Sequence, residues 1–180
     1  IVGFDDEHAR VIAATVAGPG GPIRVLNGYF VNGQAPESDK FAYKLKWLDG
    51  LQAYVRAELA RQPRLLLMGD FNIAPEDRDS YDPVGLAGTI HHTDAEREHF
   101  RALLGLGLAD SFRMFEQPPK SYSWWDYRML GYQKNRGLRI DHILVSEALR
   151  PQVSACTIDR VPRKWDKPSD HAPVIVELSD

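Results

Sequence analysis

The run Leu65–Met68 constrains the fold of this chain more than any other feature. It is fully apolar, it lies between Pro63 and Gly69, and it is too short for a helix, so we expect a buried central strand. The preceding residues 38–61 predict a helix, which begins at the N-cap Ser38 and ends at Pro63. Its apolar side chains recur three or four positions apart: Phe41, Leu45, Leu48, Leu51, Val55 and Leu59.

The rest of the chain contains more strand-like than helical segments. We expect strands at 11–16, 23–26, 121–126, 140–145, 153–158 and 174–178, with a turn at 18–22. A capping box, Thr93-Asp-Ala-Glu96, predicts a second helix to about Leu104, closed by Gly105 and Gly107. Residues 74–93 and 131–137 are expected to be loops. Because the order is not a regular βαβ alternation, the fold class is expected to be α/β, with layers and mixed sheets.

Length and composition indicate one ordinary globular domain, 1–180. The chain has 180 residues, 43% of them hydrophobic and 26% charged. The single cysteine, Cys156, excludes an internal disulfide, and its apolar surroundings predict a small buried side chain, which fits a reducing compartment. No run is long enough to cross a membrane and no cationic leader precedes an apolar segment, so we expect neither a membrane partner nor secretion. Because the chain begins at Ile1, we expect a fragment or a processed product.

The charge distribution is uneven. The net charge of −3 argues weakly against a polyanionic partner. Residues 120–167, however, contain ten Lys and Arg against five Asp and Glu, with aromatic residues between them. This pattern suits a phosphate backbone, although a solvated surface of mixed charge is an equally good interpretation.

Three motifs place carboxylates at the ends of strand-like segments: Gly69-Asp-Phe-Asn72, Arg139-Ile-Asp-His142 and Ser169-Asp-His171. Asp70 and Asn72 point the same way if the extended geometry continues, although Asp and Asn are also common turn formers. Asp141 interrupts an apolar strand, so it is either salt-bridged or orients a functional partner. Carboxylates to hold a divalent cation and an imidazole near a phosphate are what a metal-dependent phosphoesterase needs.

Other polar and aromatic residues leave alternatives open. Tyr29 either packs at the edge of the core or donates its hydroxyl to a phosphate. Trp124 and Trp125 are either core aromatics or stacking surfaces for a nucleotide, and strand alternation places them on opposite sides. His142 is expected on the other face of the sheet from Asp141. The surface is the expected place for His8, His91, His92 and His99.

Five segments resemble the exonuclease III family of abasic-site endonucleases, within the endonuclease/exonuclease/phosphatase superfamily. They are Asn27-Gly-Tyr-Phe30, Met68-Gly-Asp-Phe-Asn-Ile-Ala-Pro75, Tyr122-Ser-Trp-Trp-Asp-Tyr-Arg128, Asn135-Arg-Gly-Leu-Arg-Ile-Asp141 and Lys167-Pro-Ser-Asp-His-Ala-Pro173. The resemblance implies a sandwich of two mixed β-sheets flanked by helices. It implies hydrolysis of DNA phosphodiesters with Mg²⁺ or Mn²⁺, 5′ of abasic sites and from 3′ ends, by a monomer in the bacterial cytoplasm that reaches the nucleoid through DNA.

The resemblance also implies roles for individual residues. Asp70 would align or activate the attacking water, and Asn72 would orient it. His171 would contact the scissile phosphate, Asp141 would hold that imidazole, and Tyr29 would donate to the phosphate. The metal would be bound by Asp170, Asp70 and Asn72. Contacts to DNA and to the extruded abasic sugar are implied for Trp124, Arg128, Asn135, Arg136, Leu138 and Ile140.

The chain departs from the family pattern at its start. Family members begin with a strand ending in Asn and a strand ending in a metal-binding Glu, and neither aligns with this chain. If nothing precedes Ile1, we expect weak metal binding, little activity and an exposed apolar sheet edge. The alternatives are therefore an active DNA-repair nuclease and a DNA-binding remnant of one. A relative acting on lipid or nucleotide phosphates fits the basic, aromatic segment less well.

Overall fold

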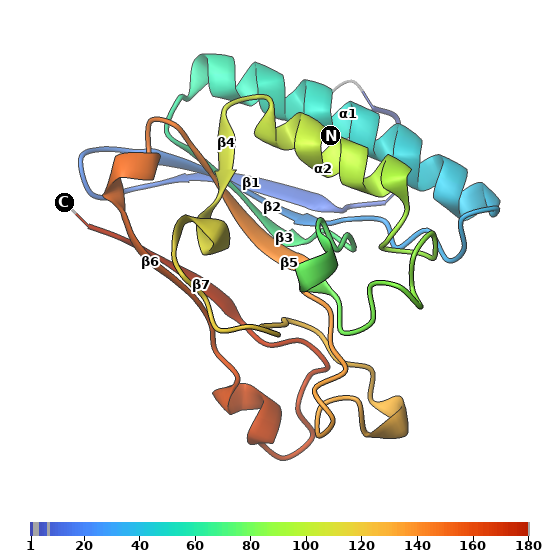
Figure 1. Cartoon of the computed structure of the whole chain (residues 1–180). Coiled ribbons are helices and arrows are strands. Elements are labelled where there is room, and N and C mark those ends of the chain that lie inside the picture. Colours follow the sequence, from blue (N-terminus) through green and yellow to red (C-terminus); the bar gives the residue numbers. More distant parts are fainter. Residues whose placement is uncertain (2–3, 7, 180) are drawn as a thin grey trace.

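A computed structural model describes residues 1, 4–6 and 8–179, and Figure 1 shows its layers. The larger sheet has the order β1-β2-β3-β5-β4. Strands β2 and β3 run parallel and the other pairs are antiparallel, so the sheet is mixed, as predicted. The bounds of its strands in chain order are β1 Val11–Val16, β2 Ile23–Tyr29, β3 Leu65–Asp70, β4 Leu108–Asp110 and β5 Asp141–Ser146.

Two helices cover one face of this sheet, and a second sheet lies on the other face (Figure 1). The helices are α1, Asp39–Arg61, and α2, Asp94–Leu104. The second sheet pairs β6, Val153–Ile158, with β7, Val174–Leu178, in antiparallel orientation. Short 3₁₀ helices are η1 Asp77–Asp79, η2 Ser111–Met114, η3 Arg128–Leu130, η4 Arg150–Gln152 and η5 Val161–Lys164.

The leucine run of β3 is buried on both of its faces. Leu65 and Leu67 point into the core beneath the helices, together with Trp47 of α1. Leu66 points the other way, into the core shared with Val153 of β6. Because helices cover one face and the second sheet covers the other, every position of the run meets apolar neighbours, which explains a strand without polar alternation. The prediction of a buried central strand is confirmed.

The predicted helix starts are also confirmed. The Ser38 side chain accepts a hydrogen bond from the Phe41 backbone N–H at 3.1 Å. At the start of α2, Thr93 and Glu96 exchange side-chain and backbone hydrogen bonds as a capping box. Both helix starts are therefore specified locally, by a capping side chain that satisfies free backbone N–H groups.

Some predicted elements differ from the structure. Residues 121–126 form no regular strand, and Trp124 makes isolated bridges with Leu138 and His171 instead. Strand β4 was not predicted, because three residues are too few to show a period. In the described part of the chain the second sheet has two antiparallel strands rather than a mixed set. The sheet edge at β1 exposes apolar side chains, and 69% of Ile12 is accessible to solvent. Among the described residues, no helix is long and apolar enough to span a membrane.

The end of β3 brings two strands unusually close. Gly69 has φ +137°, and a Cβ at this position would lie 1.9 Å from the Gly28 carbonyl oxygen of β2. Only glycine fits this approach. The parallel register then places Tyr29 beside Asp70, and the antiparallel register with β5 places Asp141 on the other side of Asp70. Three polar residues thus lie side by side at one end of the sheet.

Candidate active site

Asp70, Asp141 and His171 gather at the end of the larger sheet. Asp70 ends β3, Asp141 begins the neighbouring β5, and His171 lies just before β7. The bridge between Trp124 and His171 brings the third residue to the first two. One ligand atom from each lies within 4.8 Å of the others, and all three line a cleft of about 430 Å³. The three motifs predicted to act together are therefore adjacent in space.

Asp141 holds the imidazole of His171. Nδ1 of His171 lies 2.9 Å from Oδ2 and 3.1 Å from Oδ1 of Asp141. Burial opposes protonation of the ring, but the hydrogen bond to Asp141 and the charges of Asp141, Asp70 and Asp170 outweigh it, so the pKa of His171 is raised. Asp141 is thus paired with His171 and orients its ring, which agrees with both interpretations of this carboxylate.

Asn72 holds both oxygens of the Asp70 carboxylate. Its backbone N–H donates to Oδ1 at 2.9 Å and its side-chain Nδ2 donates to Oδ2 at 3.1 Å. The extended geometry does not continue here, because Asn72 has φ +52°. The expectation that both side chains point the same way by strand alternation is therefore wrong, and a left-handed turn brings the amide back onto the carboxylate.

The protonation of Asp70 reflects its surroundings. Burial raises its pKa to about 6, and the nearby negative charge of Asp141 adds to the effect. Two carboxylates held this close favour a cation between or beside them. Carboxylate oxygens are the donors that Mg²⁺ and Mn²⁺ prefer, so this part of the donor set fits the implied metals. The amide oxygen of Asn72 accepts from Asn32 Nδ2 at 3.2 Å, so the structure gives it a protein partner rather than a free face.

Asp170 lies next to an apolar hollow. Its Oδ2 accepts a hydrogen bond of 2.9 Å from Nε1 of Trp124, and Trp124 packs with the buried Leu138 and Ile140. A second cavity of about 470 Å³ is lined by Trp124 and Leu138 and by the basic side chains Arg128 and Arg136. Most of the predicted substrate-binding residues therefore surround one hollow beside the carboxylates.

The two tryptophans face opposite sides, as predicted. Trp125 is fully buried and packs edge-on against Tyr132 at a ring distance of 5.1 Å. Its Nε1 donates to Oδ1 of Asn135, whose Nδ2 donates to the Lys120 carbonyl. Both ends of the Asn135 amide are thus bound within the protein. Arg128 is exposed and pairs with Asp126.

Tyr29 shares the sheet end but not the cleft. Its side chain is 58% exposed, and the Arg10 guanidinium lies 5.6 Å from its ring centre. It lines a neighbouring hollow together with Asn32 and Gln34. Tyr29 therefore lies next to Asp70 in the sheet, but its side chain lines a different hollow from the Asp70–Asp141–His171 group.

The histidine predictions need correction. His92 is buried, with its Nε2 3.0 Å from Ser80 Oγ, and His91 is half-buried, with its Nδ1 2.6 Å from the Asn72 carbonyl oxygen. The expected surface position is therefore wrong for both. The loop that carries them packs against Asn72 and Ser80, which takes both rings inside. His8 is exposed as predicted, and Cys156 is buried as predicted.

His142 lies on the opposite face from Asp141, as predicted, but it is fully enclosed. Its Nδ1 lies 3.0 Å from Nη1 of Arg139, which can only donate, and its Nε2 lies 2.9 Å from the Ile73 carbonyl. Burial, and next the charge of Arg139, lower the pKa of His142 to about 4. The ring is therefore neutral near pH 7, and it links Arg139 to the Ile73 carbonyl just after Asn72.

Two buried charges near the site were not predicted, Lys44 of α1 and Glu96 of α2. Both are inaccessible to solvent, and they form an ion pair. A signal for Lys44 was present in the sequence. It lies three residues after Phe41 and four before Leu48, on the apolar stripe of the helix, where a lysine requires a partner.

Comparison with known proteins agrees with this geometry. The chain matches the model of the Endonuclease/Exonuclease/phosphatase family over residues 1–171. It is 37% identical to exodeoxyribonuclease III of Haemophilus influenzae, over 97% of this chain and 68% of that protein. It is 35% identical to the DNA repair nuclease APEX1 of Danio rerio, over 97% of this chain and 53% of that protein.

Solved structures give the same result. A 3′ phosphatase, NExo, from Neisseria, bound to a product DNA hairpin, superposes with a TM-score of 0.93 at 47% identity, over 97% of this chain and 66% of that one. An AP endonuclease from Archaeoglobus fulgidus gives a TM-score of 0.88 at 32% identity, over 95% and 65%. The chain thus spans about two thirds of these two proteins and about half of the Danio rerio protein.

Proposed function

Because the chain belongs to the endonuclease/exonuclease/phosphatase family, and within it to the exodeoxyribonuclease III nucleases, we propose that it is a metal-dependent hydrolase of DNA phosphoesters. The proposal includes cleavage beside abasic sites and removal of nucleotides or phosphates from 3′ ends. The observation that carries it is the Asp70–Asp141–His171 group, in which one carboxylate is held by an amide and the other holds an imidazole.

Each residue has a chemical task in this proposal. Asp70 aligns the attacking water and accepts its proton as a general base. Asn72 keeps the Asp70 carboxylate in place and thereby orients the water. His171, whose raised pKa favours the imidazolium, donates to a phosphate oxygen as negative charge develops there. Asp141 fixes that ring and stabilises its charge.

The metal site would be formed by Asp70 and Asp170, beside Asn72. A bound Mg²⁺ or Mn²⁺ supplies positive charge that polarises the phosphoester. The remaining residues bind DNA. Arg128 and Arg136 contact the DNA backbone, and the Tyr29 hydroxyl donates to a phosphate. Asn135 contributes indirectly, because its Oδ1 accepts the hydrogen bond that holds Trp125 in place. Trp124, Leu138 and Ile140 accept the extruded sugar.

Three further proposals follow from the same sequence patterns. The 180 residues act as one domain, the protein works as a monomer, and it acts on DNA in the bacterial cytoplasm. The nucleases and the DNA-bound phosphatase that it resembles support the action on DNA.

The test is a panel of three DNA substrates. One is a duplex with an abasic analogue, one has a recessed 3′ end, and one carries a 3′-phosphate. Each is incubated with the purified protein in Mg²⁺, Mn²⁺ or EDTA, alongside an Asp70→Asn variant. We expect metal-dependent cleavage of at least one substrate, which the variant lacks. Tight, metal-independent binding without cleavage would instead identify a DNA-binding remnant, and preference for a small phosphoester would exclude DNA as the substrate.

A further inference from the structure

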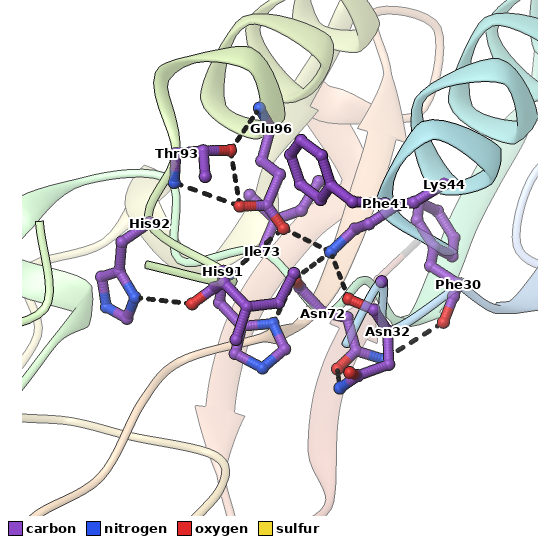
Figure 2. A network of polar contacts seen from close by, with 12 residues as sticks. Phe30, Asn32, Phe41, Lys44, Asn72, Ile73, His91, His92, Thr93 and Glu96 are labelled. Atoms are coloured by element: carbon purple, nitrogen blue, oxygen red, sulfur yellow. Dashed lines mark hydrogen bonds and ion pairs between the residues drawn. The ribbon is translucent and has the colours of Figure 1, made fainter. Parts of the chain in front are cut away.

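The ion pair between Lys44 and Glu96 lies next to Asn72, whose carbonyl oxygen accepts a hydrogen bond from Lys44 (Figure 2). Lys44 comes from α1 and Glu96 from α2, so the two helices meet at this pair. Both side chains are fully inaccessible. Buried ion pairs are weak evidence for a purely stabilising role, because apolar residues of similar size often serve as well. The contacts of this pair therefore need a more specific explanation.

Lys44 uses all three of its N–H donors. Its Nζ donates to the Asn72 carbonyl at 2.8 Å, to the Asn32 carbonyl at 3.1 Å, and to the Glu96 carboxylate. Two of the three bonds thus go to backbone carbonyls next to the Asp70–Asp141–His171 group rather than to the partner helix. Asn32 in turn donates its Nδ2 to the Asn72 side chain at 3.2 Å, so Lys44 fixes Asn72 directly and also fixes its neighbour.

Glu96 fixes the same segment from the other side. One of its oxygens accepts from Lys44 and from the His91 backbone N–H at 3.1 Å. The other oxygen accepts from the Thr93 backbone N–H at 3.1 Å and from the Thr93 hydroxyl at 2.7 Å. His91 then donates through Nδ1 to the Asn72 carbonyl. Both acceptor positions of that carbonyl are therefore filled, one by Lys44 and one by His91.

The fixed residue is the one that holds Asp70. Asn72 has φ +52°, a conformation that is uncommon outside glycine and that persists when its surroundings determine it. In this conformation its N–H and its Nδ2 reach the two oxygens of Asp70. A rotation about the Asn72 backbone would move both donors at once. The Lys44 and His91 bonds to the carbonyl oppose that rotation.

We propose that Lys44, together with Glu96, is a positioning residue that locks the Asn72 turn and thereby orients the Asp70 carboxylate. The inference rests on the proposed function for its kinetic consequence, but not for its structural one. Lys44 does not touch the substrate in this proposal. It acts through the Asn72 carbonyl, so its loss should impair the chemical step rather than the binding of DNA.

The experiment compares Lys44→Met with Glu58→Gln in the intact protein. Methionine keeps the length of the side chain and removes its donors. Glu58 lies on the same helix and pairs with Arg24 at 2.6 Å, away from the catalytic edge, so it serves as a matched control. Two quantities are measured below the melting temperature of each variant. One is hydrogen exchange at the Asn72 backbone amide by NMR, and the other is kcat and KM on the best DNA substrate.

For Lys44→Met we expect exchange at the Asn72 amide to accelerate by roughly 10-fold or more and kcat to fall by roughly 10- to 100-fold, with KM within about twofold. Glu58→Gln should change neither quantity. Unchanged Asn72 exchange and kcat in folded Lys44→Met, or equal losses in Glu58→Gln, would overturn the proposal. If Lys44→Met does not fold, the double variant Lys44→Met/Glu96→Gln, which buries no unpaired charge, carries the same prediction.

The two proposals fail in distinguishable ways. If the native protein cleaves no DNA substrate, the proposed function fails, and the Asn72 exchange rate still tests the positioning role. If the native protein cleaves DNA and the Lys44 variants exchange and cleave normally, only the positioning role is wrong.

Discussion

Replacing Arg139 with methionine should destabilise the protein strongly. The guanidinium is 1% exposed and lies between two buried carboxylates. Its Nε is 2.7 Å from Oδ1 of Asp79 and its Nη2 is 2.7 Å from Oδ2 of Asp110, while Nη1 donates to His142. Removing one partner of a buried ion pair typically costs about 3–5 kcal/mol, because the remaining charge has no counterion. Arg113 still pairs with Asp79, which places the expected cost near the lower end of that range.

Urea denaturation at pH 7 measures this cost. We expect the free energy of unfolding of Arg139→Met to fall by about 3 kcal/mol with an unchanged dependence on urea concentration. The double variant Arg139→Met/Asp110→Asn should recover at least about 1 kcal/mol, because the stranded carboxylate is neutralised. Two results would refute this explanation of the buried cluster. One is a loss below about 1 kcal/mol in Arg139→Met, and the other is a double variant that loses more stability than the two single variants together.

Three further predictions follow from individual contacts. The pKa of His142 is about 4 in the folded protein against 6.5 for a free imidazole, so the neutral ring contributes roughly 3 kcal/mol to the free energy of unfolding above pH 6.5, and this contribution is lost as the pH falls toward 4. Between pH 7 and 5 the free energy of unfolding measured in urea should therefore fall more steeply in the native protein than in His142→Gln. An equal pH dependence of the two proteins would contradict this. Asp141→Asn should lower the pKa of His171, because it removes the charge that favours the imidazolium; an NMR titration that gives the same pKa would count against the pair. Ser38→Ala should cost about 1 kcal/mol of stability, since the Phe41 N–H loses its acceptor, and no change in the urea midpoint would exclude a capping role.

The sequence predicted those parts of the fold that local patterns determine. The apolar stripe and cap of α1, the capping box of α2 and the apolar run of β3 are each written within a few neighbouring residues. The segment 121–126 was predicted as a strand, yet in the structure Trp125 packs in a core cluster and Trp124 lines a cavity. Its backbone partners come from distant segments that no local period reveals.

The candidate site shows the same division. The carboxylates at strand ends were predicted from three separate motifs, because chance is less likely to place a carboxylate there three times than once. Lys44 and Glu96, in contrast, are 52 positions apart, and their pairing depends on how two helices pack. The left-handed turn at Asn72 also depends on that packing. The sequence therefore indicated which groups gather at the candidate site, whereas tertiary contacts determine how they are oriented.

The most direct test of the central claim is the rate of metal-dependent DNA cleavage by a His171→Asn variant. It should be measured at saturating Mg²⁺ on the substrate that the native protein cleaves best, with DNA binding measured in parallel. The account predicts that cleavage falls by roughly 100-fold or more while DNA binding stays within a few fold, because the imidazolium acts on charge that develops during the reaction. Cleavage at the native rate by a folded, DNA-binding variant would show that the Asp70–Asp141–His171 group is not the catalytic centre.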